Sequence, residues 1–143
     1  MSVARLVDRP IDALRLIGEV ADSGKGAISV FLGTVRDTSD GRSVVSLHYS
    51  AYAAMAQAEL DRVLAEVGEQ FGVTSAVIEH RTGSLEVGDV SIGIAMSHEH
   101  RAPAMAAVTY AIEEIKRRVP IWKDEVYADG TREWVDPTAA AVR

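Results

Sequence analysis

The chain has 143 residues, of which 48% are hydrophobic and 25% are charged, and this balance excludes a disordered protein. Its length suits one domain, which we expect to span residues 1–143. The formal net charge of −6 disfavours a general binder of nucleic acid or of anionic membranes, because both need a basic protein surface.

The N-terminal half is predicted to contain two helices and two strands. Pro10 suits the first turn of a helix, and apolar residues at near-helical spacing continue to Val20. Residues 27–35 are rich in β-formers and predict a strand, and residues 44–49 predict a second strand after a polar loop. Across residues 55–70, apolar side chains recur at i, i+3, i+4 and i+7, which predicts an amphipathic helix.

The C-terminal half begins with two more predicted strands, residues 73–80 and residues 90–96. In the second of these, large side chains on one face alternate with small residues such as Gly93 on the other. Small residues on a strand face indicate that another part of the chain packs closely there. Residues 102–118 predict a second long helix, which ends before Pro120.

A hairpin is predicted at the end of the chain. Residues 122–127 and 132–135 form its strands, joined across Asp129-Gly130, a favourable turn pair. The order of helices and strands lacks strict βαβ alternation, and the sequence has no glycine-rich phosphate loop. We therefore predict an α+β fold with a largely antiparallel sheet.

Cysteine is absent, which excludes disulfides, thiolate metal sites and a cysteine nucleophile. If the protein handles sulfur, the reactive sulfur atom must therefore arrive on another molecule. No apolar run reaches membrane-spanning length, and the N-terminus lacks the apolar core of a signal peptide. We expect a cytoplasmic protein.

Lys116 is one of only three lysines, and a helical projection puts it beside the apolar residues Met105 and Ile112. One interpretation is a lysine whose stem covers the core while its amine reaches water. The other is a partly desolvated amine with a lowered pKa, suited to act as a general base or to bind an anion. The helical projection leaves both open. The opposite face carries two solvent-facing ion pairs at i, i+4 spacing, Glu113–Arg117 and Glu114–Arg118.

Further cationic residues stand at the ends of predicted elements. Lys123 follows seven residues after Lys116, so the two are either unrelated or converge on one pocket. Arg36 ends the first predicted strand, as an exposed residue or as a guanidinium for an anion. His100 and Arg101 open the second long helix, where free N–H groups and the helix dipole favour phosphate. These residues suggest a local pocket for a small anionic ligand.

A metal site is the weaker interpretation of the histidines. His98 and His100 have i, i+2 spacing and would face one side of a strand, as two metal ligands do. The sequence places no third ligand beside them. We expect no metal and no other cofactor.

Six short motifs follow one another from about residue 5 to Val135: Phe31-Leu32-Gly33-Thr34-Val35-Arg36, Tyr49-Ser50-Ala51-Tyr52, His80-Arg81-Thr82-Gly83, Gly88-Asp89, Ser97-His98-Glu99-His100-Arg101, and Ile115-Lys116 with Val119-Pro120-Ile121-Trp122-Lys123-Asp124-Glu125. Together, and in this order, they resemble the large, catalytic subunit of molybdopterin synthase. No single motif is as specific as a metal-binding cysteine pattern, but the order and the Pro-x-Trp-Lys segment make the resemblance strong.

The resemblance implies an α+β fold of the α/β hammerhead type with an additional antiparallel β subdomain. It implies a sulfurtransferase that converts cyclic pyranopterin monophosphate to molybdopterin, in molybdenum cofactor biosynthesis, by installing the dithiolene sulfurs. The sulfur donor is then a thiocarboxylate at the C-terminal Gly-Gly tail of a small ubiquitin-like subunit. The family forms a homodimer with one small subunit at each end, a heterotetramer, and each pocket lies near the dimer interface.

The resemblance also assigns residues. The family's catalytic lysines match Lys116 and Lys123, and its substrate-anion groups match Arg36, His100 and Arg101. Two departures stand out. The family commonly has Glu where Ser50 stands, so Ser50 receives no catalytic role, and the tail at residues 138–142 is Ala-rich where relatives often carry polar residues and a further arginine.

Two other classes of function remain open. One is a lysine-dependent lyase that forms a Schiff base with a small phosphate substrate. The other is a non-catalytic binding paralogue of the same fold, against which the presence of both Lys116 and Lys123 speaks. The sequence does not decide which lysine is the acid/base and which binds the anion.

Overall fold

Residues 1–136 are described by a computed structural model, which contains three helices and two β-sheets within that range. The first sheet has four strands, in the order β1 (Ser2–Val7), β5 (Ser75–Arg81), β7 (Val90–His98) and β2 (Ala27–Thr34). β1 is parallel to β5, and the other two pairings are antiparallel. The predicted α+β class is confirmed.

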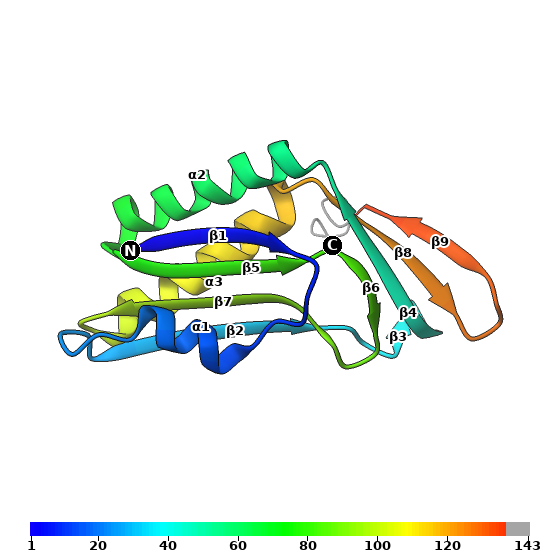
Figure 1. The fold of residues 1–143 in the computed structure, drawn as a ribbon, viewed down its shortest axis with the longest axis horizontal. Helices are drawn as coiled ribbons and strands as arrows, with labels where there is room; N and C mark the ends of the chain where they lie inside the picture. The colour runs from blue at the N-terminus through cyan, green and yellow to red at the C-terminus, as the bar shows by residue number, and fades with distance from the viewer. Residues whose placement is uncertain (137–143) are drawn as a thin grey trace.

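The helices cover both faces of the first sheet (Figure 1). They are α1 (Ala13–Val20), α2 (Ala53–Phe71) and α3 (Arg101–Arg118). Successive residues of a strand point to opposite faces, and the buried clusters divide accordingly. Ile78 and Ile94 pack with α2 and α3, whereas Val77 and Ala95 pack with α1. The central strands β5 and β7 are therefore buried on both faces.

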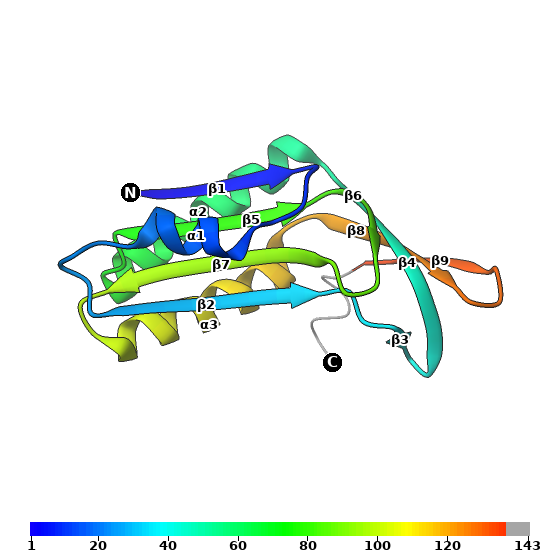
Figure 2. The ribbon, with the colours of Figure 1, turned by 60° about the horizontal axis from the view of Figure 1, so that its bottom comes forward.

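The second sheet lies beyond the end of β2 and closes one end of the molecule (Figure 2). Its path runs β3 (Thr38–Ser39), β4 (Arg42–Ala51), β8 (Ile121–Tyr127) and β9 (Arg132–Val135), and β6 (Gly83–Glu86) also pairs with β4. The predicted C-terminal hairpin is confirmed, with β8 antiparallel to β9. β4 and β8 make the longest pairing in this sheet and hold it beside the C-terminal end of α3.

Most predicted elements match the observed ones to within two or three residues, and the differences have local causes. The first helix begins at Ala13 and not at Pro10, because the side chain of Asp12 accepts hydrogen bonds from the N–H groups of Leu14 and Arg15 and caps the helix there. α2 ends at Gly72, whose φ of 69° is the left-handed conformation that favours glycine. Strands β1, β3 and β6 were not predicted.

The close packing predicted over the small face of β7 is also observed. A Cβ atom built on Gly93 would lie 2.6 Å from Leu16 Cδ1 and 3.0 Å from Ile11 Cγ2. Only a residue without a side chain fits under α1 at this point.

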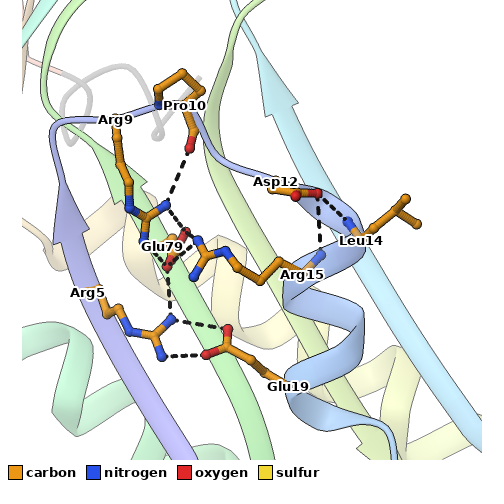
Figure 3. Close-up of polar contacts among 8 residues, drawn as sticks. All are labelled: Arg5, Arg9, Pro10, Asp12, Leu14, Arg15, Glu19 and Glu79. Carbon is orange, nitrogen blue, oxygen red and sulfur yellow. Dashed lines mark hydrogen bonds and ion pairs between the residues drawn. The ribbon is translucent and has the colours of Figure 1, made fainter.

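A cluster around Glu79 fixes α1 and β1 to the sheet (Figure 3). The Glu79 carboxylate is fully buried and accepts hydrogen bonds from Arg5, Arg9 and Arg15, each at 2.9 Å. Arg5 also pairs with Glu19 at 2.5 Å. Burial alone would raise the pKa of Glu79, but the three guanidinium groups outweigh it and hold the pKa below its ordinary value. We call these five residues the Glu79 cluster.

The polar face of α3 differs from its prediction. Arg118 pairs with Glu114 at 3.3 Å as expected, but it also reaches across to Glu66 of α2 at 2.7 Å, so it joins two helices and does not face solvent. Arg117 is exposed and pairs with Glu114 at i, i+3, not with Glu113.

β2 is an edge strand of the first sheet. Its residues alternate, and the face on the side of α1 carries three exposed apolar side chains, Ile28, Val30 and Leu32. Met105 of α3, an apolar neighbour of Lys116 in the helical projection, is 61% exposed. We call Ile28, Val30 and Leu32 the β2 edge surface. Within residues 1–136, no helix is long and apolar enough to cross a membrane.

Candidate active site

A hollow of about 180 Å³ lies where the end of β2 meets the second sheet and the last turn of α3. Three cationic residues from separate parts of the chain line it. Arg36 follows β2, Lys116 belongs to α3 and Lys123 belongs to β8. The second sheet therefore brings together three of the five residues that the sequence analysis selected.

Lys116 is half-buried on the inner side of the last turn of α3. Burial is the main cause of a lowered pKa for its amine, and the positive charge of Lys123 lowers it further. A lowered pKa increases the fraction of neutral amine near neutral pH. The site thus has the desolvated amine of the second interpretation, on a stem that also packs against the core as in the first.

Lys123 is held by a buried carboxylate. Its Nζ lies 3.2 Å from Oε1 of Glu125, whose side chain is 2% exposed. Glu125 also accepts hydrogen bonds from Ser39 Oγ at 3.2 Å and from the hydroxyl of Tyr127 at 2.9 Å. Burial acts to raise the pKa of Glu125, but these donors outweigh it and the pKa is lowered. Glu125 therefore remains a carboxylate beside the lysine.

A second hollow of about 290 Å³ continues from the first toward β9. The two share Arg36, Ser39, Lys123 and Glu125 in their walls. Trp134 lines the outer part of the second hollow. The two hollows therefore adjoin, and the first reaches Lys116 while the second reaches β9.

Behind Lys116 lie two residues that the sequence analysis did not select. His80 of β5 is 3% exposed, and its ring stands edge-on to Tyr49, with centroids 5.3 Å apart. Both residues line a cavity of about 10 Å³ together with Lys116. Tyr49 is also the cross-strand partner of Lys123 and lines the main hollow. Tyr49, His80 and Glu125 all lie in motifs of the family resemblance. The i, i+2 spacing of Lys123 and Glu125 on one strand could have identified Glu125, but nothing in the motif that contains His80 gives that residue a role at the site.

His100 and Arg101 do not reach this hollow within one chain. They stand at the start of α3, both exposed, whereas Lys116 is in its last turn. Fifteen residues of helix separate Arg101 from Lys116, about 22 Å along the axis. His98 accepts a hydrogen bond at Nδ1 from the backbone N–H of His100, and residues 1–136 contain no group of three side chains that could hold a metal.

Comparisons with known proteins agree on one family. A family model described as "MoaE protein" matches residues 6–118. The molybdopterin synthase catalytic subunit of Oryza sativa subsp. indica is 43% identical over 133 residues, which are 90% of this chain and 69% of the rice protein.

Solved structures show the same likeness. Molybdopterin synthase from Staphylococcus aureus matches with a TM-score of 0.86 at 37% identity, covering 91% of this chain and 94% of that one. A protein–protein complex of subunits 1 and 2 of the molybdopterin-converting factor from Helicobacter pylori 26695 contains the same fold. That match has a TM-score of 0.76 at 22% identity and covers 92% and 89% of the two chains.

Proposed function

The chain belongs to the MoaE family, whose named relatives are molybdopterin synthase catalytic subunits, and from this premise we propose that it is the sulfur-transferring subunit of such an enzyme. In this proposal the chain takes sulfur from a thiocarboxylate on the C-terminal tail of a small partner subunit. The acceptor is cyclic pyranopterin monophosphate, and the product is the dithiolene of molybdopterin.

The observation that carries the proposal is the convergence of Arg36, Lys116 and Lys123 in one hollow of a protein that has no cysteine. Three cations suit a substrate with a phosphate group. Without a thiol of its own, the chain needs a carrier that delivers the sulfur. In this proposal the tail enters along the two adjoining hollows, a path from β9 to Lys116 that suits glycine because glycine has no side chain to meet the walls.

The two lysines have different surroundings, and this difference suggests different roles. Lys116, with its lowered pKa, is suited to exchange a proton with the reacting groups or to hold the acyl group of the tail briefly. Lys123, paired with Glu125, is suited to stabilise the developing oxyanion and to bind the phosphate.

We further propose that a second copy of the chain completes the site. The hollow of about 180 Å³ is smaller than the roughly 300–1,000 Å³ of most small-molecule sites. β2 is an edge strand, its N-terminal end lies beside the start of α3, and its C-terminal end leads to Arg36. Antiparallel pairing of two β2 edges across a twofold axis would satisfy the free backbone groups of each edge and place the β2 edge surfaces of the two copies side by side on one face of a continuous sheet. It would also bring His100 and Arg101 of the second copy toward the hollow.

The function is tested with purified chain, a thiocarboxylated small subunit and the pterin precursor. Molybdopterin formation is expected, and adding one residue after the terminal glycine of the partner should abolish it without preventing complex formation. Full turnover with the extended tail would contradict the proposed path. Covalent trapping by borohydride with a carbonyl substrate would instead favour the Schiff-base lyase.

The assembly is tested by mixing two inactive variants, Lys116→Ala and Arg101→Ala, at limiting substrate. If each site takes Lys116 from one chain and Arg101 from the other, half of a mixed population is heterodimeric and about a quarter of the sites are intact. Activity should then rise to about a quarter of wild type. No gain on mixing would contradict the placement of Arg101 in the site of the neighbouring copy.

A further inference from the structure

The buried residue His80 has no part in the chemistry described above, although it shares a cavity with Lys116. The cavity measures about 10 Å³, close to the space of one water molecule. Its polar side chains are His80, Tyr49 and Lys116, and its remaining walls are apolar (Ile115, Val119 and Ile121). A buried site of this kind is where a single water molecule joins two polar groups.

The hydrogen bonding of His80 fixes which ring nitrogen carries the proton. Nδ1 lies 3.0 Å from the carbonyl oxygen of Arg81, and a carbonyl only accepts, so Nδ1 carries the proton. Nε2 is then the unprotonated nitrogen and can only accept. The ring is held in place on its face by the edge-on contact with Tyr49.

The charge state of His80 follows from its position. Burial, together with the positive charge of Lys116, lowers the pKa of His80 to about 4, so the imidazole is neutral at neutral pH. A neutral acceptor stabilises a nearby ammonium group through a hydrogen bond, whereas an imidazolium would repel it. The other titratable or charged groups around Lys116 are Tyr49 on β4, Arg36 after β2, and Lys123 and Glu125 on β8.

We propose that His80 is a positioning residue for Lys116. In this arrangement the Lys116 amine donates a hydrogen bond to one bridging water, and that water donates a hydrogen bond to Nε2 of His80. This contact fixes Nζ at the wall of the hollow and opposes the desolvation of its charged form. The contact therefore raises the protonated fraction of the Lys116 amine at a given pH and holds Nζ in one orientation. The inference deepens the proposed function, since it concerns a residue of the same site.

Two substitutions separate this role from a structural one. Asparagine retains an N–H donor near the position of Nδ1 but has nothing at Nε2, so His80→Asn keeps the bond to Arg81 and loses the acceptor. Glutamine carries an acceptor near the position of Nε2, so His80→Gln keeps the acceptor and loses the bond to Arg81. A positioning role predicts damage in His80→Asn and rescue in His80→Gln, and a structural role predicts the reverse.

The primary measurement is the pKa of Lys116, followed by NMR of protein labelled with [13Cε]lysine. Only three lysines contribute signals, and Lys116→Arg assigns the one of interest. His80→Asn should lower the pKa of Lys116 by about one pH unit, the effect of losing one hydrogen bond to a charged group. His80→Gln should leave it within a few tenths of wild type. An unchanged Lys116 pKa in His80→Asn would overturn the proposal.

Turnover provides the second measurement. The single-turnover rate of His80→Asn should fall about tenfold with KM unchanged, and its pH profile should shift with the Lys116 pKa. The NMR titration requires neither partner nor substrate. A failed titration therefore overturns the role of His80 alone, whereas a wild-type chain without turnover overturns the proposed function alone. If His80→Asn does not fold at the temperature of the titration, the Lys116 pKa of both variants is measured at a lower temperature at which both fold. Equal Lys116 pKa values in His80→Asn and His80→Gln there count against the proposal.

Discussion

The molecule contains two buried glutamates whose surroundings are built differently. Glu79 is enclosed by the guanidinium groups of Arg5, Arg9 and Arg15 on the α1 face of the first sheet. Glu125 is held by one lysine and two hydroxyl groups at the wall of a hollow. Arginine is always charged, and its planar group fixes geometry, whereas lysine changes its protonation state and its orientation more readily.

This difference indicates what each carboxylate contributes. The Glu79 cluster joins β1, α1 and β5, and none of its residues lines the two hollows of the candidate active site, so we expect its effect to be on stability. Glu125 faces the two hollows that contain Lys123, so its effect is on the reacting side chains. A buried carboxylate alone therefore does not mark a site; its partners and the space beside it do.

The largest expected effect is on the chemistry at Lys116 and Lys123. Replacing either by alanine should lower the single-turnover rate about 10²–10⁴-fold, the usual result of losing an acid/base group or an oxyanion donor. The melting temperature should hold or rise slightly, because Lys116→Ala removes a half-buried charge and improves helix propensity.

Arg117→Ala is the matched control for the lysines. Arg117 is next to Lys116 on the same helix, but its side chain is 68% exposed and pairs with Glu114. Its loss should change neither rate nor stability appreciably. Near-wild-type rates in both lysine variants would leave only a binding module.

Glu79→Gln should have the largest effect on stability. Removing a buried charge from its partners costs about 3–5 kcal/mol, and we expect the lower end, since Arg9 and Arg15 are about 40% exposed and water screens them. Urea denaturation measures this loss, and turnover per folded molecule should not change.

Glu125→Gln should affect the rate more than the stability, the opposite of Glu79→Gln. A glutamine still accepts from Ser39 and Tyr127, so the loss of stability should be about 1–3 kcal/mol, while the rate per folded molecule should fall because Lys123 loses its counter-ion. If Glu79→Gln lowers the rate per folded molecule as much as Glu125→Gln does, the two carboxylates do not differ in the way proposed.

A smaller effect is expected at the start of α3. Arg101→Ala should weaken substrate binding about ten- to a hundredfold, the result of losing one charge-assisted contact. Equilibrium binding of the pterin precursor to the folded variant measures it, with Arg117→Ala again as the control. Unchanged affinity would remove Arg101 from the site.

The smallest effect is the pH dependence of stability. Both buried glutamates have a pKa below the ordinary value of 4.5, so their ionised forms stabilise the folded state above about pH 4.5. This stability is lost as the pH falls from there through the lowered pKa values. The melting temperature should therefore change little with pH near neutral pH and fall as the pH becomes acidic. This fall should be less steep for Glu79→Gln than for the wild type. An equal acid response in wild type and variant would contradict the lowered pKa of Glu79.

Long periodic segments of the sequence predicted most of the fold. α2, α3 and the β8–β9 hairpin were found because each carries its own pattern and its own terminating residue. β1 was missed because its formation depends on pairing with β5, about seventy residues away, and Arg5 interrupts its apolar pattern. β6 was missed because four residues are too few to show a period.

The residues of the site also fall into two groups, those that a local sequence pattern indicates and those that only the tertiary structure brings to the site. Lys116 was selected from the helix projection, since its surroundings depend on neighbours three and four residues away. His80 and Ser39 come to the site from β5 and β3, and only the tertiary arrangement brings them there. Arg36, His100 and Arg101 were selected from the family resemblance and their positions at element ends, but the distance of about 22 Å between the two ends of α3 keeps His100 and Arg101 out of the hollow within one chain. The Ala-rich tail at residues 138–142 lies outside the described residues.

α3 is an uninterrupted helix without glycine that carries Arg101 at one end and Lys116 at the other. It is fastened to α2 near its C-terminus by Arg118. In the proposed dimer, each copy of α3 would therefore be a rigid strut between two reaction centres, with one end in each. A ligand that displaces the strut at one centre moves it at the other, so occupancy of the first centre alters the affinity of the second. Binding isotherms of the dimer would then depart from those of two independent sites.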